Sequence, residues 1–288
     1  MFKSQRMIQY CYVNGELTGV QDAAVKVTDL ALLRGYGAFD YFLVKDYKPY
    51  FLQDYLNRFF HSAKLLRLDL PFSLEEVQQQ ILHLLEANRQ PDAGIRLLLT
   101  GGYATDGYTP TTPNLLVLQY PASSYPASSY ESGIKMISHR FTREMPEIKS
   151  LNYVTGIWLL EELKKQGASD ALYYDGKYIS ESARSNIFMI DANGVLCTPN
   201  TNILMGVTRK HIIKVASETM PVEERPITLE EIKSAQEAFL TSSTKALLPV
   251  IQIDDAIIGN GHPGSKTMEL KQRYLDYRDK IHAKAVFS

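Results

Sequence analysis

The sequence predicts an α+β protein that is divided into two domains. Three observations support this fold class. Strand-like and helix-like segments are mixed without strict alternation, hairpin turn signals recur, and one stretch rich in proline and serine interrupts the chain. That stretch consists of two adjacent copies of Tyr-Pro-Ala-Ser-Ser, at residues 120–124 and 125–129. We therefore expect a domain at residues 1–120, a linker at 121–130 and a second domain at 131–288.

In the first domain, strands are predicted at 8–13 and 18–27 around the hairpin turn Asn14-Gly15. Strands are also predicted at 38–44 and 49–51, and later at 94–100 and 115–119. A helix is expected at 54–67, with its apolar residues on one face, and a second helix runs to residue 87 from a capping box formed by Ser73 and Glu76. A loop rich in glycine and tyrosine follows at 101–113.

In the second domain, the pattern predicts strands separated by turns and four helices. The expected strands are 133–138, 170–175, 178–180, 186–190, 195–198, 237–241, 249–253 and 256–258. The expected helices are 155–166, 208–217, 229–235 and 265–282.

The composition excludes several classes of function. The chain has 288 residues, of which 45% are hydrophobic and 22% charged, as in an ordinary globular protein. Its formal net charge of -1 offers no basic field for nucleic acid or an anionic membrane. No window approaches the roughly 18 apolar residues of a membrane span. Cys11 and Cys197 lack metal-binding spacing and are expected to be reduced thiols in a cytoplasmic protein.

Common catalytic motifs are missing from the sequence. It contains no dinucleotide fingerprint, phosphate loop, His-Glu-x-x-His or Gly-x-Ser-x-Gly, and its six histidines are scattered. No metal site is therefore predicted. What the sequence does contain is a set of groups suited to pyridoxal phosphate, which requires an amine, an acid beside its ring nitrogen and donors for its phosphate.

Lys149 can supply the amine, because it lies where a strand-like run changes into a helix-like run. Glu181, at the end of a strand and flanked by small residues, can supply the acid. Phosphate donors are predicted at the helix start after Gly206, where the N–H groups of Val207 and Thr208 point outward. Arg58 can add a cation, and the run 241–244 adds hydroxyls. Taken singly, each feature is also compatible with a solvated charge, an ordinary helix start or a simple turn.

Their order along the chain is more specific. The chain resembles the class IV, or fold type IV, pyridoxal-phosphate aminotransferases, a family that includes branched-chain and D-amino-acid aminotransferases and aminodeoxychorismate lyase. The segments that carry the resemblance are 34–40, 57–63, 148–153, 181–188, 203–209 and 237–249. The resemblance implies a small two-layer α/β N-terminal domain and a larger, β-barrel-like C-terminal domain with helices, which carries the cofactor lysine.

The resemblance also implies roles for individual residues. Lys149 matches the lysine that binds the cofactor covalently and moves the substrate proton, and Glu181 matches the acid on the pyridine nitrogen. The remaining cofactor-binding residues implied are Arg58, Tyr153, Val207, Thr208 and Ser243. The substrate-binding candidates are Phe39, Tyr41, Arg96, Tyr103 and Thr244.

The substrate is predicted less directly. Arg96 and Phe39 resemble the branched-chain enzymes, in which the arginine holds the distal carboxylate of 2-oxoglutarate. Tyr41, however, replaces a small residue of that subfamily, and the loop at 100–103 lacks the arginine that D-amino-acid enzymes use. We expect a ping-pong transaminase that leans towards branched-chain L-amino acids. The alternatives are a D-amino-acid aminotransferase, aminodeoxychorismate lyase and a non-catalytic relative.

A homodimer is expected, because in this family the small domain of one subunit closes the active site of the other. The loop at 101–110, with Tyr103 and Tyr108, is the candidate for that contact.

Overall fold

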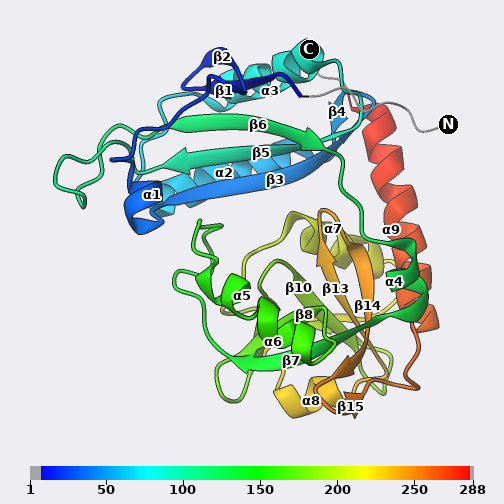
Figure 1. Cartoon of the computed structure of the whole chain (residues 1–288). Coiled ribbons are helices and arrows are strands. Elements are labelled where there is room, and N and C mark those ends of the chain that lie inside the picture. Colours follow the sequence, from blue (N-terminus) through cyan, green and yellow to red (C-terminus); the bar gives the residue numbers. More distant parts are fainter. Residues whose placement is uncertain (1–7, 286–288) are drawn as a thin grey trace. The chain divides into compact units, whose positions relative to one another are not determined.

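The computed structural model describes residues 8–285, which fall into two compact units (Figure 1). The first unit comprises the chain up to Ser123, the short segment Ile148–Asn152 and the C-terminal residues from Lys284. The second comprises Ser124–Glu147 and Tyr153–Ala283. The segment that contains Lys149 is therefore grouped with the first unit, whereas the sequence assigned it to the second domain. None of the helices in the described part of the chain is sufficiently long and apolar to cross a membrane.

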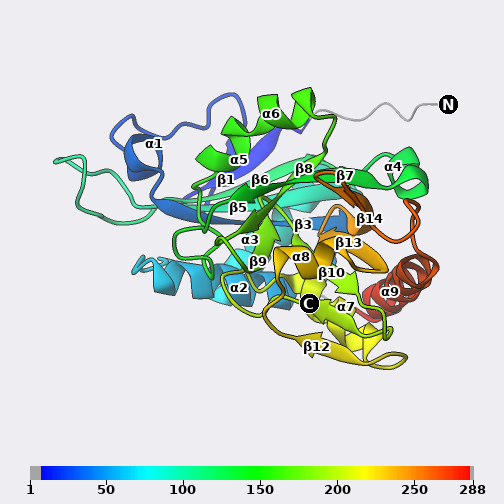
Figure 2. The same cartoon turned by 90° about the horizontal axis from the view of Figure 1, so that it is seen from below.

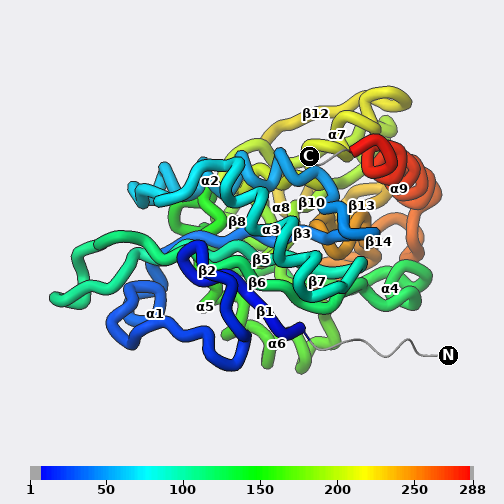
Figure 3. Tube along the Cα trace, turned by 90° about the horizontal axis from the view of Figure 1, so that it is seen from above, coloured from blue at the N-terminus to red at the C-terminus, as the bar shows by residue number. Residues whose placement is uncertain are grey.

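The first unit is built on a six-stranded antiparallel sheet. Its strands, in spatial order, are β2 (Glu16–Gly19), β1 (Tyr10–Val13), β6 (Leu115–Pro121), β5 (Ala93–Thr100), β3 (Gly37–Lys45) and β4 (Lys48–Pro49). Two helices, α2 (Leu52–Leu65) and α3 (Leu74–Asn88), lie side by side on one face (Figures 1 and 3). Alternate residues of the central strands, such as Phe42, Ile95 and Val117, are buried beneath them.

Local sequence signals explain most of these elements. The predicted capping box begins α3: the Oγ of Ser73 accepts from the Glu76 N–H, and the Glu76 carboxylate accepts from the Ser73 N–H. The short helix α1 (Leu30–Arg34) is capped by Asp29. The predicted strand at 18–27 is wrong beyond Gly19, because the chain turns there. The N–H groups of Asp22 and Ala23 both donate to the carbonyl of Gly19.

The second unit is a nine-stranded sheet that closes on itself. In spatial order its strands are β12 (Val222–Glu224), β11 (Leu196–Thr198), β10 (Asn186–Ile190), β13 (Glu237–Ser242), β14 (Ala246–Ile253), β7 (Ile134–Arg140), β8 (Asp170–Tyr174) and β9 (Ile179–Ser182), and β15 (Ala256–Ile257) pairs with β14. Because β9 also pairs with β10, where Glu181 lies opposite Asn186, six of these strands form a closed barrel. The barrel-like second domain predicted from the resemblance is confirmed.

Helices surround this barrel. They are α4 (Ala127–Ser132), α5 (Val154–Trp158), α6 (Leu160–Lys165), α7 (Val207–Ala216), α8 (Leu229–Lys233) and α9 (Ser265–Lys284). The single helix predicted at 155–166 is present as α5 and α6, which meet at the buried Leu159. Leu159 and Leu163 pack against Ile137 of β7 and Tyr173 of β8. The two helices and these strands are labelled in Figure 2. Three of the five residues of the second pentad belong to α4, a segment that the sequence predicted as mostly linker.

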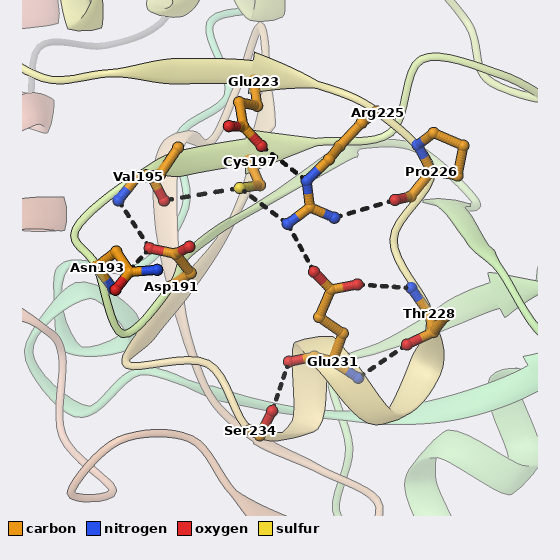
Figure 4. A network of polar contacts seen from close by, with 10 residues as sticks. All are labelled: Asp191, Asn193, Val195, Cys197, Glu223, Arg225, Pro226, Thr228, Glu231 and Ser234. Carbon is orange, nitrogen blue, oxygen red and sulfur yellow. Dashed lines mark hydrogen bonds and ion pairs between the residues drawn. The ribbon is translucent and has the colours of Figure 1, made fainter.

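An arginine stabilises the edge of the second sheet (Figure 4). The guanidinium of Arg225 donates to Glu223 at 2.9 Å and lies 2.6 Å from a carboxylate oxygen of Glu231. It also lies 3.4 Å from the Sγ of Cys197 on β11. Glu231 in turn caps α8 through a capping box with Thr228. Arg225 thereby links β11 and α8 to the segment that follows β12. Burial raises the pKa of the Cys197 thiol.

Candidate active site

Lys149 is held against the edge of β3 that β5 does not cover. The N–H of Phe39 donates to the carbonyl of Lys149 at 2.9 Å, and the N–H of Leu151 donates to the carbonyl of Gly37 at 3.0 Å. On α2, the buried Oγ of Ser62 accepts from the N–H of Lys149 at 3.3 Å. These backbone contacts determine where the lysine side chain starts.

The amine of Lys149 lies over an aromatic ring. Its Nζ is 4.6 Å from the centroid of Phe39, within the range of a cation–π contact. Just before the lysine, Ile148 is buried and anchors the segment in the first unit. The predicted catalytic lysine and the predicted substrate residue Phe39 are therefore neighbours.

Arg58 on α2 forms an ion pair that the sequence did not predict. Its Nη2 lies 2.6 Å from one carboxylate oxygen of Asp40, and its Nε donates to the other oxygen at 2.9 Å. Asp40 is fully buried on the face of β3 that the helices cover, while the Arg58 side chain is 11% exposed. The two hydrogen bonds orient the plane of the guanidinium.

The remaining substrate candidates of this unit lie in two places. Tyr41 and Arg96 are directly opposite each other on β3 and β5, on the face that α2 and α3 do not cover. Tyr103 pairs with Asp29 through an isolated bridge, and the Nζ of Lys26 lies 5.0 Å from its ring. Tyr103 thus packs at the base of the loop 101–110.

The tip of that loop has its own internal order. The carboxylate of Asp106 accepts from the N–H groups of Tyr108 and Thr109 and from the Thr109 hydroxyl. These bonds, led by the Thr109 hydroxyl, lower the pKa of Asp106 to about 2. Tyr108, at 78% exposure, is presented to solvent on this turn in the single chain.

In the second unit, Glu181 lies at the pairing that closes the barrel. One of its carboxylate oxygens is 2.7 Å from Nη1 of Arg143. The other accepts from the side-chain amide of Asn186 at 3.2 Å and from the N–H of Leu204 at 3.1 Å. The glutamate is only 4% exposed, so it is a buried acid with three donors and not the solvated loop residue that was the alternative.

Arg143 and Asn186 are functional candidates that the sequence reasoning missed. Arg143 lies in the irregular segment after β7, 38 residues before its partner, and no periodicity marks it. Asn186 stood within the segment 181–188, but its link to the segment before α7 was not expected: its amide donates to the carbonyl of Leu204 at 2.8 Å. A search for a buried cation to balance a predicted buried acid would have found Arg143 as a candidate.

Gly206 begins α7 in close contact with this cluster. A Cβ at position 206 would lie 2.1 Å from Oδ1 of Asn186, so only glycine fits without displacement. The first N–H groups of α7, from Val207 and Thr208, have no partner within the helix, and both residues are buried. The start of α7 is therefore suited to an anion, as the sequence predicted.

Ser243 and Thr244 lie in the turn between β13 and β14, and both are half-buried. The turn is followed by Lys245, a buried lysine whose Nζ lies 3.0 Å from Asp170 and 2.8 Å from the Oγ of Ser185. Because Ser185 belongs to the turn between β9 and β10, Lys245 connects the hydroxyl-bearing turn to the turn that follows Glu181.

Tyr153 precedes α5 and is half-buried in the second unit. It lies within electrostatic range of Tyr173, as do Glu181 and Arg143. Burial, assisted by Asp170, raises the pKa of Tyr173 to about 12.

The residues of each unit fit the chemistry of pyridoxal phosphate. The first unit supplies an amine and an oriented guanidinium, and the second supplies a buried carboxylate, a helix start and hydroxyls. The close approach at Gly206 leaves no room for a side chain between Asn186 and the start of α7. Among residues 8–285, no group of three or more histidine, cysteine and acidic residues is placed to hold a metal ion.

Comparison with known proteins agrees with this description. The model of the family described as amino-transferase class IV matches residues 37–253. The chain is 34% identical over 281 residues to the putative branched-chain-amino-acid aminotransferase of Methanocaldococcus jannaschii, covering 93% of this chain and 96% of that protein. It is 31% identical over 273 residues to D-alanine aminotransferase of Staphylococcus epidermidis, covering 92% of this chain and 96% of that protein.

Solved structures share the fold. Branched-chain amino acid aminotransferase of Escherichia coli aligns with a TM-score of 0.87 and 27% identity over 94% of both chains. A second branched-chain amino acid aminotransferase, from T.th. and solved with pyridoxamine 5'-phosphate, aligns with a TM-score of 0.87 and 25% identity over 95% of both chains. The predicted fold type is confirmed, and the chain belongs to the class IV aminotransferases.

Proposed function

We propose that the protein binds pyridoxal 5'-phosphate and moves an amino group from an amino acid, with a leaning towards branched-chain L-amino acids, to a 2-oxo acid such as 2-oxoglutarate. The observation that carries the proposal is the buried Glu181 carboxylate with its three donors. A carboxylate held in this way suits a protonated pyridine nitrogen. When bound, the cofactor supplies an electron sink that eases loss of the substrate α-proton.

Each residue of the chain has a defined task in this proposal. Lys149 holds the cofactor covalently and moves the proton at the substrate Cα, and the ring of Phe39 lies beside its amine. Arg58, oriented by Asp40, and the N–H groups that begin α7 bind the phosphate. The hydroxyls of Thr208 and Ser243 add phosphate contacts, and that of Tyr153 contacts the ring oxygen.

The substrate residues supply specificity. Arg96 binds a carboxylate on the substrate side chain, while Phe39 and Tyr41 limit the space available to that side chain. Tyr103 and Thr244 complete the set of substrate contacts.

The experiment with the sharpest outcome is a half-reaction. Purified enzyme with bound cofactor is mixed with an L-amino acid and no acceptor, and the visible spectrum is recorded. A transaminase shifts the absorbance to that of the aminated cofactor, and 2-oxoglutarate then restores the starting spectrum. A lyase acting on aminodeoxychorismate, or a non-catalytic relative, gives no such cycle, and that result would reject the proposal.

Lys149→Ala tests the attachment of the cofactor. The variant is expected to lose the visible band that borohydride traps on the protein, while an exposed lysine variant such as Lys165→Ala keeps it. A trapped band that survives Lys149→Ala would assign the attachment to another lysine.

A D-amino-acid aminotransferase is the second candidate, and the 31% identity to D-alanine aminotransferase favours it. A panel of L- and D-amino acids with 2-oxoglutarate and pyruvate separates the two. Turnover of leucine, valine or isoleucine in the L form supports the first candidate. Turnover confined to D-alanine and related D-amino acids supports the second.

We further propose that the protein acts as a homodimer. The single chain exposes large apolar residues on α5 and α6, with Trp158 at 71% exposure and Ile157 at 65%, and it exposes Tyr108 on its loop. Light scattering coupled to size exclusion measures the mass directly. A monomer of 32.6 kDa at micromolar concentration would contradict the proposal.

A further inference from the structure

Arg96 occupies the centre of the sheet face that α2 and α3 leave uncovered. On this face it lies between Tyr41 of β3 and Leu118 of β6, its direct cross-strand neighbours. Three aromatic rings surround its guanidinium carbon: Tyr120 at 5.3 Å, Phe39 at 5.6 Å and Tyr41 at 5.8 Å from their centroids. All three distances lie within the range of a cation–π contact.

No carboxylate balances this cation within residues 8–285, where Arg96 contacts rings and takes part in no ion pair. Its Nε is buried and has no hydrogen-bond partner among the described residues. Buried donors in native proteins are normally satisfied. A guanidinium held by rings and lacking an acid is therefore prepared for an anion from outside the chain.

The ring of Tyr41 is fixed in place on this face. A Cβ at Gly94 would lie 2.0 Å from the Tyr41 hydroxyl oxygen and 2.5 Å from the ring carbon that carries it, so the ring extends over the glycine. The hydroxyl also lies 3.2 Å from the Oγ of Ser123. Tyr41 therefore depends on the absence of a side chain at position 94.

We propose that Tyr41 is a specificity-determining residue that acts with Gly94. Its fixed ring confines the Arg96 guanidinium and fills the space beside it. The site therefore binds the carboxylate-ended side chain of a 2-oxo acid such as 2-oxoglutarate more tightly than the branched alkyl side chain of the amino donor, which it still admits. This inference rests on the proposed function, because it takes Arg96 as a substrate-binding residue, and it adds a preference for dicarboxylic substrates that Tyr41 imposes.

Two unreactive ligands of similar length separate these side chains. Glutarate and 4-methylvalerate each carry one carboxylate for the common end of the substrate, followed by two methylene groups. Glutarate then ends in a methylene group that carries a second carboxylate, whereas 4-methylvalerate ends in an isopropyl group. The measurement is the ratio of their dissociation constants, obtained by calorimetry on the enzyme with bound cofactor. Binding is read directly, independently of turnover.

Three variants perturb the ring in different ways. Tyr41→Ala removes it, and Gly94→Ala displaces it without changing either functional side chain, because the added Cβ cannot share space with the hydroxyl. Both are expected to reduce the preference for glutarate about 10-fold, because each removes one ring contact to Arg96 and opens the space that the ring filled. Tyr41→Phe keeps the ring and is expected to hold the ratio within about threefold of the original protein.

The double variant Tyr41→Ala with Gly94→Ala tests whether Gly94 acts through Tyr41. If it does, adding Gly94→Ala to Tyr41→Ala leaves the ratio unchanged, since no ring remains to be displaced. A ratio within about threefold of the original in both single variants would overturn the inference. Thermal unfolding shows whether each variant folds. If one of Tyr41→Ala and Gly94→Ala does not fold, the ligand ratio of the other decides whether the inference holds.

The failure of this inference differs from failure of the proposed function. An original protein that transfers amino groups but whose ligand ratio ignores both substitutions would overturn the role of Tyr41 alone. An original protein that passes no amino group from any L- or D-amino acid to 2-oxoglutarate or pyruvate would overturn the proposed function and this inference together.

Discussion

Replacing Glu181 by glutamine tests the buried cluster most directly. Both oxygens of the carboxylate accept hydrogen bonds: one from Arg143, the other from Asn186 and the N–H of Leu204. Glutamine has a single acceptor oxygen, and its NH2 group is a donor. In either orientation of the amide, at least one donor therefore faces another donor in a buried place.

The least costly arrangement sets the expected magnitude. The glutamine oxygen would keep the Asn186 and Leu204 donors, and its NH2 group would face the guanidinium of Arg143, whose side chain is 12% exposed. Breaking a buried ion pair costs about 3 to 5 kcal/mol. Arg143 keeps its hydrogen bond to the carbonyl of Pro146 at 3.2 Å, so we expect a loss of about 2 to 4 kcal/mol.

Calorimetry measures this loss as a lower unfolding temperature, by about 6 to 12 °C for the mid-range value of 3 kcal/mol. Glu161→Gln is the matched control, because it makes the same chemical change in an exposed ion pair with Lys165. That control should shift the unfolding free energy by less than about 0.5 kcal/mol. If Glu181→Gln melted within about 1 °C of the original protein, the loss of the ion pair with Arg143 would cost far less than about 2 to 4 kcal/mol, which would contradict the prediction.

Three further predictions concern the second unit. Raised to a pKa of about 12 mainly by burial, Tyr173 binds its proton more tightly in the folded than in the unfolded state, whose pKa is near 10. The resulting stability is fully present below pH 10 and is lost as the pH rises towards 12, by about 2 to 3 kcal/mol. Denaturant titrations at about pH 8 and pH 12 should therefore differ less for Tyr173→Phe than for the original protein. Lys245→Met leaves the buried Asp170 carboxylate without its cation, and urea unfolding should show a loss of about 3 kcal/mol in the free energy of unfolding. Adding Asp170→Asn should recover part of that loss. An unchanged free energy of unfolding in Lys245→Met would contradict this prediction. Arg225→Ala removes a half-exposed ion-pair network and should lower the free energy of unfolding by about 1 to 2 kcal/mol. A thiol reagent should also label Cys197 faster in this variant. Unchanged labelling would show that Arg225 does not cover the thiol.

Groups that depend on local sequence were predictable, and groups that depend on distant partners were not. The capping box of α3 involves two residues three positions apart, so the sequence predicts it and the structure confirms it. The helix start at Gly206 is local in the same way. Arg143, by contrast, meets Glu181 across 38 residues of chain, and no spacing rule relates an irregular segment to a strand end.

The strand predicted at 18–27 failed for a related reason. Its apolar residues suggested a strand, but β2 is an outer strand, and Val27 is 74% exposed. Apolar residues extend a strand only where a neighbouring strand or a core covers them. The turn at Gly19, made by the N–H groups of Asp22 and Ala23, decides the structure there instead.

Arg58 shows how a prediction for a single residue can omit its partner. The sequence predicted an arginine for a phosphate, and the structure gives that arginine a buried carboxylate, Asp40, as a partner. A guanidinium has five N–H donors, and the two bonds to Asp40 use two of them.

Asp40 also changes the electrostatics of the site, because a fully buried carboxylate without its cation would be strongly unfavourable. Arg58 is therefore required in the first unit to balance Asp40, and its two hydrogen bonds to that carboxylate fix the orientation of the guanidinium. Asp40 therefore has two effects: it lowers the net positive charge around Arg58, and it holds the Arg58 guanidinium in one orientation. Asp40 does this from β3, where one of its carboxylate oxygens accepts from the Arg58 Nε at 2.9 Å.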